Sequence, residues 1–256
     1  MKVLVIGDIV GECGVKKVRE ILPNIKKQEN IDFIIANAEN SAEGMGITNN
    51  IFKELLALGV NVVTMGNHTW GKKDIFNFVQ HKQLLVPANY SEGVPGNRYG
   101  IYECNGTRIG VINLIGRTDM NVLSDNPFTI VNKILQKIQN DTDIIFIDFH
   151  AEATAEKIAM GYFLDGNVTA VFGTHTHVQT ADEKILENGT AYITDIGMTG
   201  PKKSVIGMSC EASIKRFLTS LPEKYKVAQG EAIFNGCIFE IDDVTHKVKH
   251  IKRVYI

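Results

Sequence analysis

The first third of the chain alternates strand patterns with helix patterns. Val3–Ile6 is a continuous apolar run, typical of a strand that is covered on both faces. Ile31–Ala36 and Val60–Met65 are read as two further buried strands. A helical spacing of apolar residues over Val15–Lys27 follows the first strand, with Gly11 to Gly14 expected as a turn, and a helix that Thr48 would cap follows the second. This order predicts an α/β fold.

Polar side chains follow each of these strands at the point where it ends, and later strands repeat the pattern. Such sheets bind ligands outside the carboxyl ends of their strands, so we expect one shared site there. The candidate residues are Asp8, Glu39, Asn40, Asn67, His68, His150, His175 and His177.

The later part of the chain adds antiparallel strands. Asn105-Gly106 and Asn188-Gly189 each separate two strand patterns, which is a strong hairpin signal. A third hairpin is expected from Ala232–Ile241 and Lys247–Val254, and a helix with Pro127 at its first position is expected to run to about Gln139. We therefore predict one domain over residues 1–256, with two layered sheets and helices outside.

Composition narrows the class of protein. The 256 residues are 44% hydrophobic and 22% charged, and the net charge is −2, so no basic surface is expected for long nucleic acids. No apolar run reaches the roughly 20 residues that a membrane span needs. Met1 to Asp8 runs straight into a strand without a signal-peptide pattern. The four widely spaced cysteines suggest free thiols and a cytoplasmic protein.

The strand-end residues are oxygen and nitrogen ligands without a thiolate, which suits Mn²⁺, Fe²⁺ or Zn²⁺. Eight such side chains are too many for one tetrahedral ion, and they fit two metals about 3.5–4 Å apart. In an extended segment His175 and His177 would point to the same side. Taken alone, this pair could equally be two unrelated polar residues in a loop.

Several short blocks, in order, resemble those of calcineurin-like metallophosphoesterases, and more closely the YmdB-like family of bacterial phosphodiesterases. The resemblance implies an α/β/β/α sandwich of two mixed β-sheets flanked by helices. Two blocks depart from the broad pattern: Val10 stands where D-x-H has histidine, and Glu39 and Asn40 stand where G-D-x-x-D is usual. The blocks are Gly7-Asp8-Ile9-Val10-Gly11, Asn37-Ala38-Glu39-Asn40, Gly66-Asn67-His68-Thr69-Trp70, Asp148-Phe149-His150-Ala151-Glu152, Gly173-Thr174-His175-Thr176-His177 and Asp195-Ile196-Gly197-Met198-Thr199-Gly200-Pro201.

The resemblance implies a hydroxide between two divalent ions, Fe or Mn with Zn also open, that attacks phosphorus in line. His68 would be the general acid that protonates the leaving oxygen. The implied substrate is a small phosphodiester, notably a 2′,3′-cyclic nucleotide. One metal would take Asp8, Glu39, Asn40 and His177, and the other Glu39, Asn67, His150 and His175.

Other readings remain open at this stage. Phosphomonoesterase or nuclease activity fits the same ligands. A metal-binding regulatory protein that acts through a partner, with incidental hydrolysis, is the alternative from another class, and Val10 is the residue that supports it. Asp148 either orients His150 or is a buried polar residue with a backbone partner, and Asp195 is similar. Broad apolar strands leave self-association open.

Overall fold

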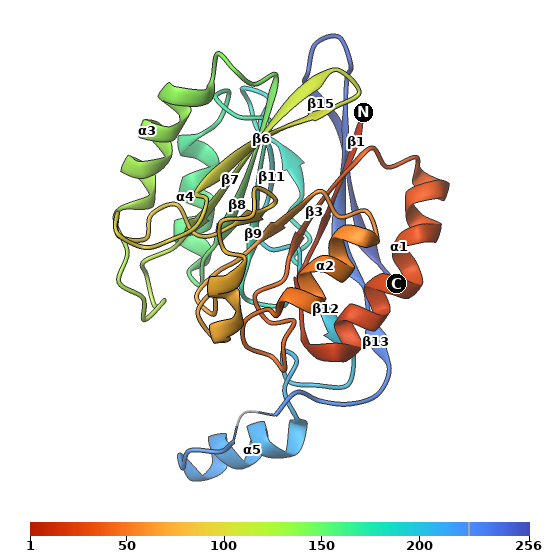
Figure 1. Cartoon of the computed structure of the whole chain (residues 1–256), viewed down its shortest axis with the longest axis vertical. Helices are drawn as coiled ribbons and strands as arrows, with labels where there is room; N and C mark the ends of the chain where they lie inside the picture. Colours follow the sequence, from red (N-terminus) through yellow and green to blue (C-terminus); the bar gives the residue numbers. More distant parts are fainter. Residues whose placement is uncertain (225) are drawn as a thin grey trace.

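Two six-stranded sheets lie face to face between layers of helices in the computed structural model, which describes residues 1–224 and 226–256 (Figure 1). The strands of the first sheet are β1 (Lys2–Ile6), β3 (Phe33–Asn37), β4 (Val62–Thr64), β5 (Leu84–Leu85), β14 (Asn235–Ile241) and β15 (Val248–Tyr255), in the order β15-β14-β1-β3-β4-β5. Those of the second are β6 (Tyr99–Cys104), β7 (Thr107–Ile115), β8 (Ile144–His150), β9 (Ala170–Thr174), β10 (Lys184–Ile185) and β11 (Ala191–Ile193), in the order β10-β11-β9-β8-β7-β6.

Both sheets are mixed. Strands β1, β3, β4 and β5 run parallel to one another, and β14 joins β1 antiparallel. Strands β7, β8, β9 and β11 are parallel, with β6 and β10 antiparallel at the edges. The three predicted hairpins are confirmed. Two of these hairpins turn at Asn105-Gly106 and Asn188-Gly189, and both glycines have positive φ.

Helices cover the outer face of each sheet. α1 (Gly11–Glu29) and α2 (Asn49–Ala57) pack on the first sheet, and α3 (Pro127–Ile138) and α4 (Thr154–Phe163) on the second (Figure 1). A third apolar cluster, which includes Val5, Phe33, Phe146 and Phe172, fills the space between the sheets. This is the α/β/β/α sandwich of two mixed sheets, so the predicted fold class is confirmed.

The remaining elements lie near the strand ends. A small sheet contains β2 (Asp8–Ile9), β12 (Met198–Pro201) and β13 (Ala232–Ile233), a short 3-10 helix covers Lys73–Asn77, and α5 (Cys210–Thr219) projects from the body (Figure 1). Within the described residues, none of the helices combines the length and apolar character that crossing a membrane requires.

Helix starts follow their capping residues. The Thr48 hydroxyl accepts a hydrogen bond from the Ile51 amide, as predicted for α2. In α3 the Asn126 side chain accepts one from the Phe128 amide, and Pro127 is the first helical residue, as predicted. The expected turn at Gly11 to Gly14 was wrong, because this stretch is the first turn of α1. A Cβ at Gly14 would overlap the carbonyl oxygen of Thr199, so Gly14 lets α1 approach β12 closely.

Gly173 allows the end of β9 to lie close to the chain just after β11. The packing there positions the loop that follows β9 and carries His175 and His177, and a substitution at Gly173 tests it. A Cβ at Gly173 would overlap the carbonyl oxygen of Thr194, while one at Gly93 would meet nothing within 4 Å. We expect Gly173→Ala to lower the free energy of unfolding by about 1–3 kcal/mol, measured by urea denaturation. Gly93→Ala is the matched control and should behave as wild type. Equal stability of the two variants would contradict the close approach.

Candidate metal centre

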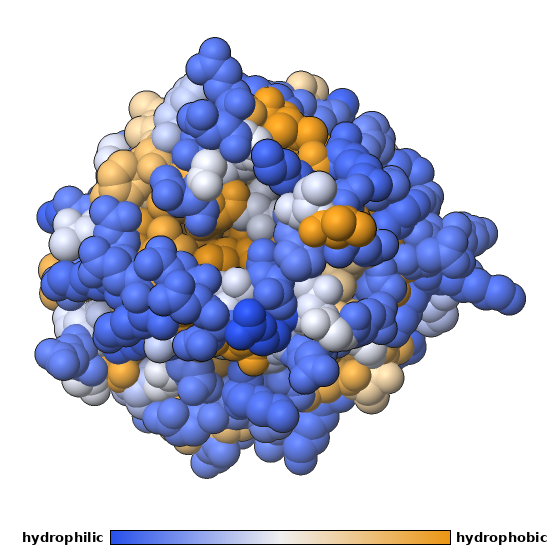
Figure 2. All heavy atoms as spheres, turned by 90° about the horizontal axis from the view of Figure 1, so that it is seen from above, coloured by the Kyte–Doolittle hydropathy of each residue, from blue (hydrophilic) through white to orange (hydrophobic). Residues whose placement is uncertain are grey.

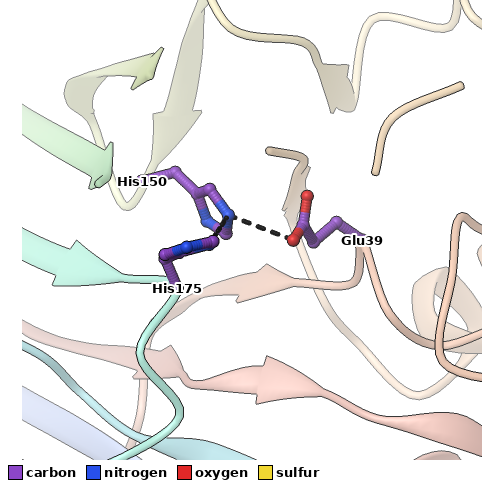
Figure 3. Close-up of side chains that lie close together, drawn as sticks. All are labelled: Glu39, His150 and His175. Atoms are coloured by element: carbon purple, nitrogen blue, oxygen red, sulfur yellow. Dashed lines mark hydrogen bonds and ion pairs between the residues drawn. The ribbon is translucent and has the colours of Figure 1, made fainter. Parts of the chain in front are cut away.

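Three side chains from three different strand ends converge on one point (Figure 3). Glu39 follows β3, His150 ends β8, and His175 follows β9. One ligand atom from each lies within 4.8 Å of the others. The side-chain amide oxygen of Asn67 (Oδ1) also lies in this cluster, 2.9 Å from His150 Nε2. The structure therefore brings together the four side chains expected at one of the two metals.

Hydrogen bonds fix the tautomer of His150. The Thr174 hydroxyl donates its hydrogen to Asp148 Oδ1 at 2.7 Å, so it accepts from His150 Nδ1 at 2.9 Å. Nε2 then presents a lone pair to Glu39 Oε1 at 3.0 Å and to the Asn67 oxygen. His175 Nδ1 lies 3.0 Å from the same Nε2. Two acceptor oxygens and two imidazole nitrogens at this spacing repel one another unless a positive charge lies among them.

The ionisation of the site shows the same need for positive charge. Burial disfavours the His150 imidazolium, but the carboxylates of Glu39, Asp8 and Asp148 outweigh it and raise the pKa of His150 to about 9. Burial also opposes ionisation of Glu39, yet His150 holds the pKa of Glu39 well below its usual value. Because a metal ligand must be a neutral imidazole, a bound cation would take the place of this proton.

His175 and His177 do not lie in an extended segment, so that part of the sequence interpretation was wrong. Their φ angles are 102° and 64°, in the left-handed region. Strand β9 ends at Thr174, and the backbone amide and hydroxyl of Thr176 both donate to Asp195 Oδ2, at 3.1 and 2.7 Å. Asp195 thus bends the loop between the two histidines.

Each of these two imidazoles has one nitrogen engaged and the other available. His175 Nε2 lies 3.0 Å from Glu152 Oε2, which leaves Nδ1 facing His150. Burial, followed by the charge of His150, lowers the pKa of His175 to about 3, so this ring is neutral. His177 Nδ1 donates to the carbonyl oxygen of Ile206 at 2.8 Å, which leaves the lone pair of Nε2 available.

Asp8 and His177 are two of the residues that the sequence predicts at the other metal. Asp8 is fully buried, and its Oδ2 accepts the backbone amide of His175 at 3.1 Å. Burial raises the pKa of Asp8, and among its neighbours the His177 imidazole opposes that rise most strongly. Asp8 Oδ1 also lies 3.8 Å from His150 Nδ1. Within the described residues, His177 is not one of the three side chains that converge on one point.

Asn40 and His68 form a linked pair beside Glu39. The Asn40 amide nitrogen donates to the Gly44 carbonyl at 3.0 Å and lies 2.8 Å from His68 Nδ1. His68 Nδ1 accepts this hydrogen, so its own proton is on Nε2. The His68 backbone amide donates to Glu39 Oε2 at 2.8 Å. The ring is partly exposed, unlike the buried side chains of Glu39 and His150.

Two orphaned oxygens support the fit of this residue set to cations. Asp8 Oδ1 and Asn40 Oδ1 are buried and have no hydrogen-bond partner among the described residues. A buried acceptor without a partner costs about 1–3 kcal/mol, and a cation would satisfy both oxygens. Carboxylate, amide oxygen and imidazole form the hard and borderline ligand set that Mn²⁺, Fe²⁺ and Zn²⁺ accept.

Several supporting residues had no assigned role at the sequence level. Thr174, between Gly173 and His175, connects His150 to Asp148 by hydrogen bonds. Asp148 in turn accepts a hydrogen bond from the Thr64 hydroxyl, which fixes its position. Of the two readings of Asp148, the geometry therefore gives the orienting one, through Thr174. Glu152, two residues after His150, contacts His175. The sequence signal for these supporting roles was that Thr174, Asp148 and Glu152 each lie within two residues of a candidate ligand histidine.

Lys157 is the residue that pattern reading missed entirely. It lies on α4 with its side chain 1% exposed, and its Nζ donates to Asp195 Oδ2 at 2.7 Å. Asp195 Oδ1 accepts the Gly197 amide at 2.8 Å, so both carboxylate oxygens are engaged. The buried ion pair therefore anchors the loop that carries His175 and His177. A single lysine in a helical pattern gives no sequence signal of such a role.

A layered α/β sandwich with carboxylate, amide and imidazole groups at its strand ends defines the calcineurin-like metallophosphoesterase class. A family model described as YmdB-like protein matches residues 4–254. The chain belongs to the YmdB-like family, as the sequence blocks predicted.

Individual relatives agree with this assignment. The chain is 48% identical over 257 residues to a 2′,3′-cyclic-nucleotide 2′-phosphodiesterase of Bacillus subtilis (strain 168), covering 100% of this chain and 97% of that protein. A crystal structure of a phosphatase of Mycoplasma pneumoniae superposes with a TM-score of 0.95 at 37% identity, covering 100% of this chain and 93% of that one. The crystal structure of a Thermus thermophilus protein gives a TM-score of 0.94 at 36% identity, covering 100% of this chain and 99% of that one. The prediction of an enzyme of the phosphodiesterase class is confirmed.

The Thr174 hydroxyl provides a direct test of the His150 geometry. Thr174→Val keeps the shape but removes the acceptor for the His150 Nδ1 proton, so the ring is no longer held in the ligating tautomer. We expect the affinity for Mn²⁺, measured by equilibrium dialysis, to fall about 10–100-fold. Thr174→Ser retains the hydroxyl and should bind as wild type. Wild-type affinity in the valine variant would show that this contact does not orient His150.

Proposed function

We propose that the protein is a phosphodiesterase that uses two divalent metal ions, most suitably Fe²⁺ or Mn²⁺, to hydrolyse small phosphodiesters. The observation that carries the proposal is the set of ligand atoms around His150 Nε2, together with the orphaned oxygens of Asp8 and Asn40. The substrate class, 2′,3′-cyclic nucleotides, is supported by the activity named for the Bacillus subtilis relative. Four free cysteines support a reducing, cytoplasmic location.

The residues would divide between the two ions as follows. Glu39 would be shared, because His150 and the His68 amide occupy opposite oxygens of its carboxylate. One ion would be held by Asp8, Glu39, Asn40 and His177, and the other by Glu39, Asn67, His150 and His175. When bound, these ions would lower the pKa of the attacking water and neutralise charge on the phosphoryl oxygens.

His68 is proposed to donate the proton that the leaving oxygen needs. Its Nδ1 accepts from Asn40, so the proton is on Nε2, the nitrogen with no partner among the described side chains. Its backbone amide is tied to Glu39, which keeps the ring next to the ligands without joining them. A histidine positioned this way contributes about 10²–10⁴-fold to rate.

The alternative is a regulatory metal-binding protein in which hydrolysis is incidental. It rests on Val10, which replaces the imidazole of the broader family and is buried. The two hypotheses differ in whether the Glu39 carboxylate supports turnover.

Replacement of Glu39 separates the two hypotheses. We expect wild type to hydrolyse 2′,3′-cyclic AMP and bis-p-nitrophenyl phosphate in the presence of Mn²⁺ or Fe²⁺, and Glu39→Gln to fall to the background rate because the shared carboxylate is lost. Glu43→Gln is the matched control, since this exposed side chain pairs only with Lys72 among the described residues. Metal-dependent turnover no higher in wild type than in Glu39→Gln would sink the proposal that two ions sharing Glu39 carry out the hydrolysis.

His68→Ala tests the acid role separately from metal binding. We expect normal metal content and a loss of about 10²–10⁴-fold in turnover of 2′,3′-cyclic AMP, whose leaving oxygen is a poor leaving group. Hydrolysis of bis-p-nitrophenyl phosphate should fall much less, because p-nitrophenolate departs without a proton. His250→Ala on the exposed face of β15 should keep full activity toward both. An equal loss on both substrates would contradict the assignment of His68 as the acid.

A further inference from the structure

Residues 205–208 form a tight turn next to the histidine loop. The amide of Val205 donates to the carbonyl oxygen of Met208, and the amide of Met208 donates to that of Val205, both at 2.9 Å. Ile206 and Gly207 are therefore the two central residues of the turn, and their φ angles are 46° and 99°. Positive φ at both central positions is the geometry of a type I′ turn, which favours the pair Asn-Gly.

The chain follows this preference at another turn but not at this one. The hairpin of β6 and β7 turns at Asn105 and Gly106, whose φ angles are 52° and 80°. At the corresponding first position stands Ile206, which is, within the described residues, the one β-branched residue with positive φ. A β-branched side chain is strained there, because its Cβ and both substituents crowd the backbone. An asparagine at position 206 would avoid this cost.

Burial within the described chain does not offset the strain, because the Ile206 side chain is 51% exposed. Exposed apolar side chains are ordinary in themselves. The end of the molecule opposite α5, for example, is mostly hydrophilic with apolar side chains scattered among the others (Figure 2). Ile206 differs because its exposure is combined with a strained backbone, which points to a contact outside the fold.

The position of the turn indicates what that contact is. The carbonyl oxygen of Ile206 accepts a hydrogen bond from His177 Nδ1 at 2.8 Å, so the turn lies against one of the expected metal ligands. Val178, directly after His177, is 59% exposed. Two exposed aliphatic residues thus adjoin this imidazole. His175 and His177 also have positive φ, and strained residues that cluster in this way are typical of functional sites.

We propose that Ile206 is a specificity-determining residue whose side chain, together with Val178, contacts the nucleoside part of the substrate beside the metal centre. This inference rests on the proposed hydrolysis of 2′,3′-cyclic nucleotides. The ribose and the base extend away from the cyclic phosphate, and both have apolar faces. Burying those faces against an aliphatic surface adds binding free energy without a hydrogen bond to a particular base.

Ile206→Asn tests the strain and the contact together. Asparagine suits the turn and keeps the backbone carbonyl that His177 needs, so the midpoint of urea unfolding should rise and the Mn²⁺ affinity should stay as in wild type. The KM for 2′,3′-cyclic AMP should rise about 3–10-fold, the order expected when about half of an aliphatic side chain is no longer buried by the substrate. The KM for glycerol 1,2-cyclic phosphate, which carries no nucleoside, should not change.

Two further variants serve as controls. Ile206→Val keeps a β-branched aliphatic side chain, so it should keep the wild-type KM for both substrates. Ile185→Asn makes the same chemical change on β10, at a residue that is 43% exposed and has no positive φ. It should alter neither KM and should not raise the urea midpoint.

Several outcomes would overturn the proposal. One is an Ile206→Asn variant with the wild-type urea midpoint or the wild-type KM for 2′,3′-cyclic AMP. Another is an equal rise in KM for both substrates, because the effect would then lie at the phosphate. Wild type that hydrolyses neither substrate would refute the proposed function itself, so the two failures are distinguishable.

Discussion

The crowding of ligand atoms around His150 Nε2 is the interaction on which the rest of the site depends. The Thr174 hydroxyl donates to Asp148 and accepts a hydrogen bond from His150 Nδ1, so the ring proton stays on Nδ1. Nε2 then has only a lone pair to offer to Glu39 and Asn67. The arrangement holds negative charge and lone pairs in a buried place, which is unfavourable without a cation. The raised pKa of His150 and the unpartnered oxygens of Asp8 and Asn40 both follow from this excess of buried negative charge and lone pairs.

The fold concentrates these groups by bringing strand ends of two sheets together. Asp8 and Glu39 come from the first sheet and its extension, while His150 and the histidine loop come from the second. Close packing at Gly14 and Gly173 allows the neighbouring segments to approach. The buried Lys157–Asp195 pair then anchors the loop after β9. Replacing one partner of such a pair typically costs about 3–5 kcal/mol, because the other charge is left buried and unpaired.

Much of this could be predicted from the sequence because it depends on local pattern. Apolar runs that end within a few residues of Asp8, Glu39 or His150 predict buried strands with polar side chains at their ends. The left-handed backbone of His175 and His177 could not be predicted, because Asp195 imposes it from a distant part of the chain. The roles of Glu152 and Lys157 likewise depend on tertiary contacts. The exposure of α5 was also hidden, since an amphipathic pattern does not say what covers its apolar face.

In the proposed function these strand ends hold two cations, and each histidine of the pair contacts a different one. Anomalous diffraction from crystals grown with Mn²⁺ tests it most directly. We expect two peaks per chain about 3.5–4 Å apart, with Glu39 between them. His150 and His175 should contact one peak, and Asp8 and His177 the other. A single peak, or two peaks with both His175 and His177 on the same ion, would contradict it.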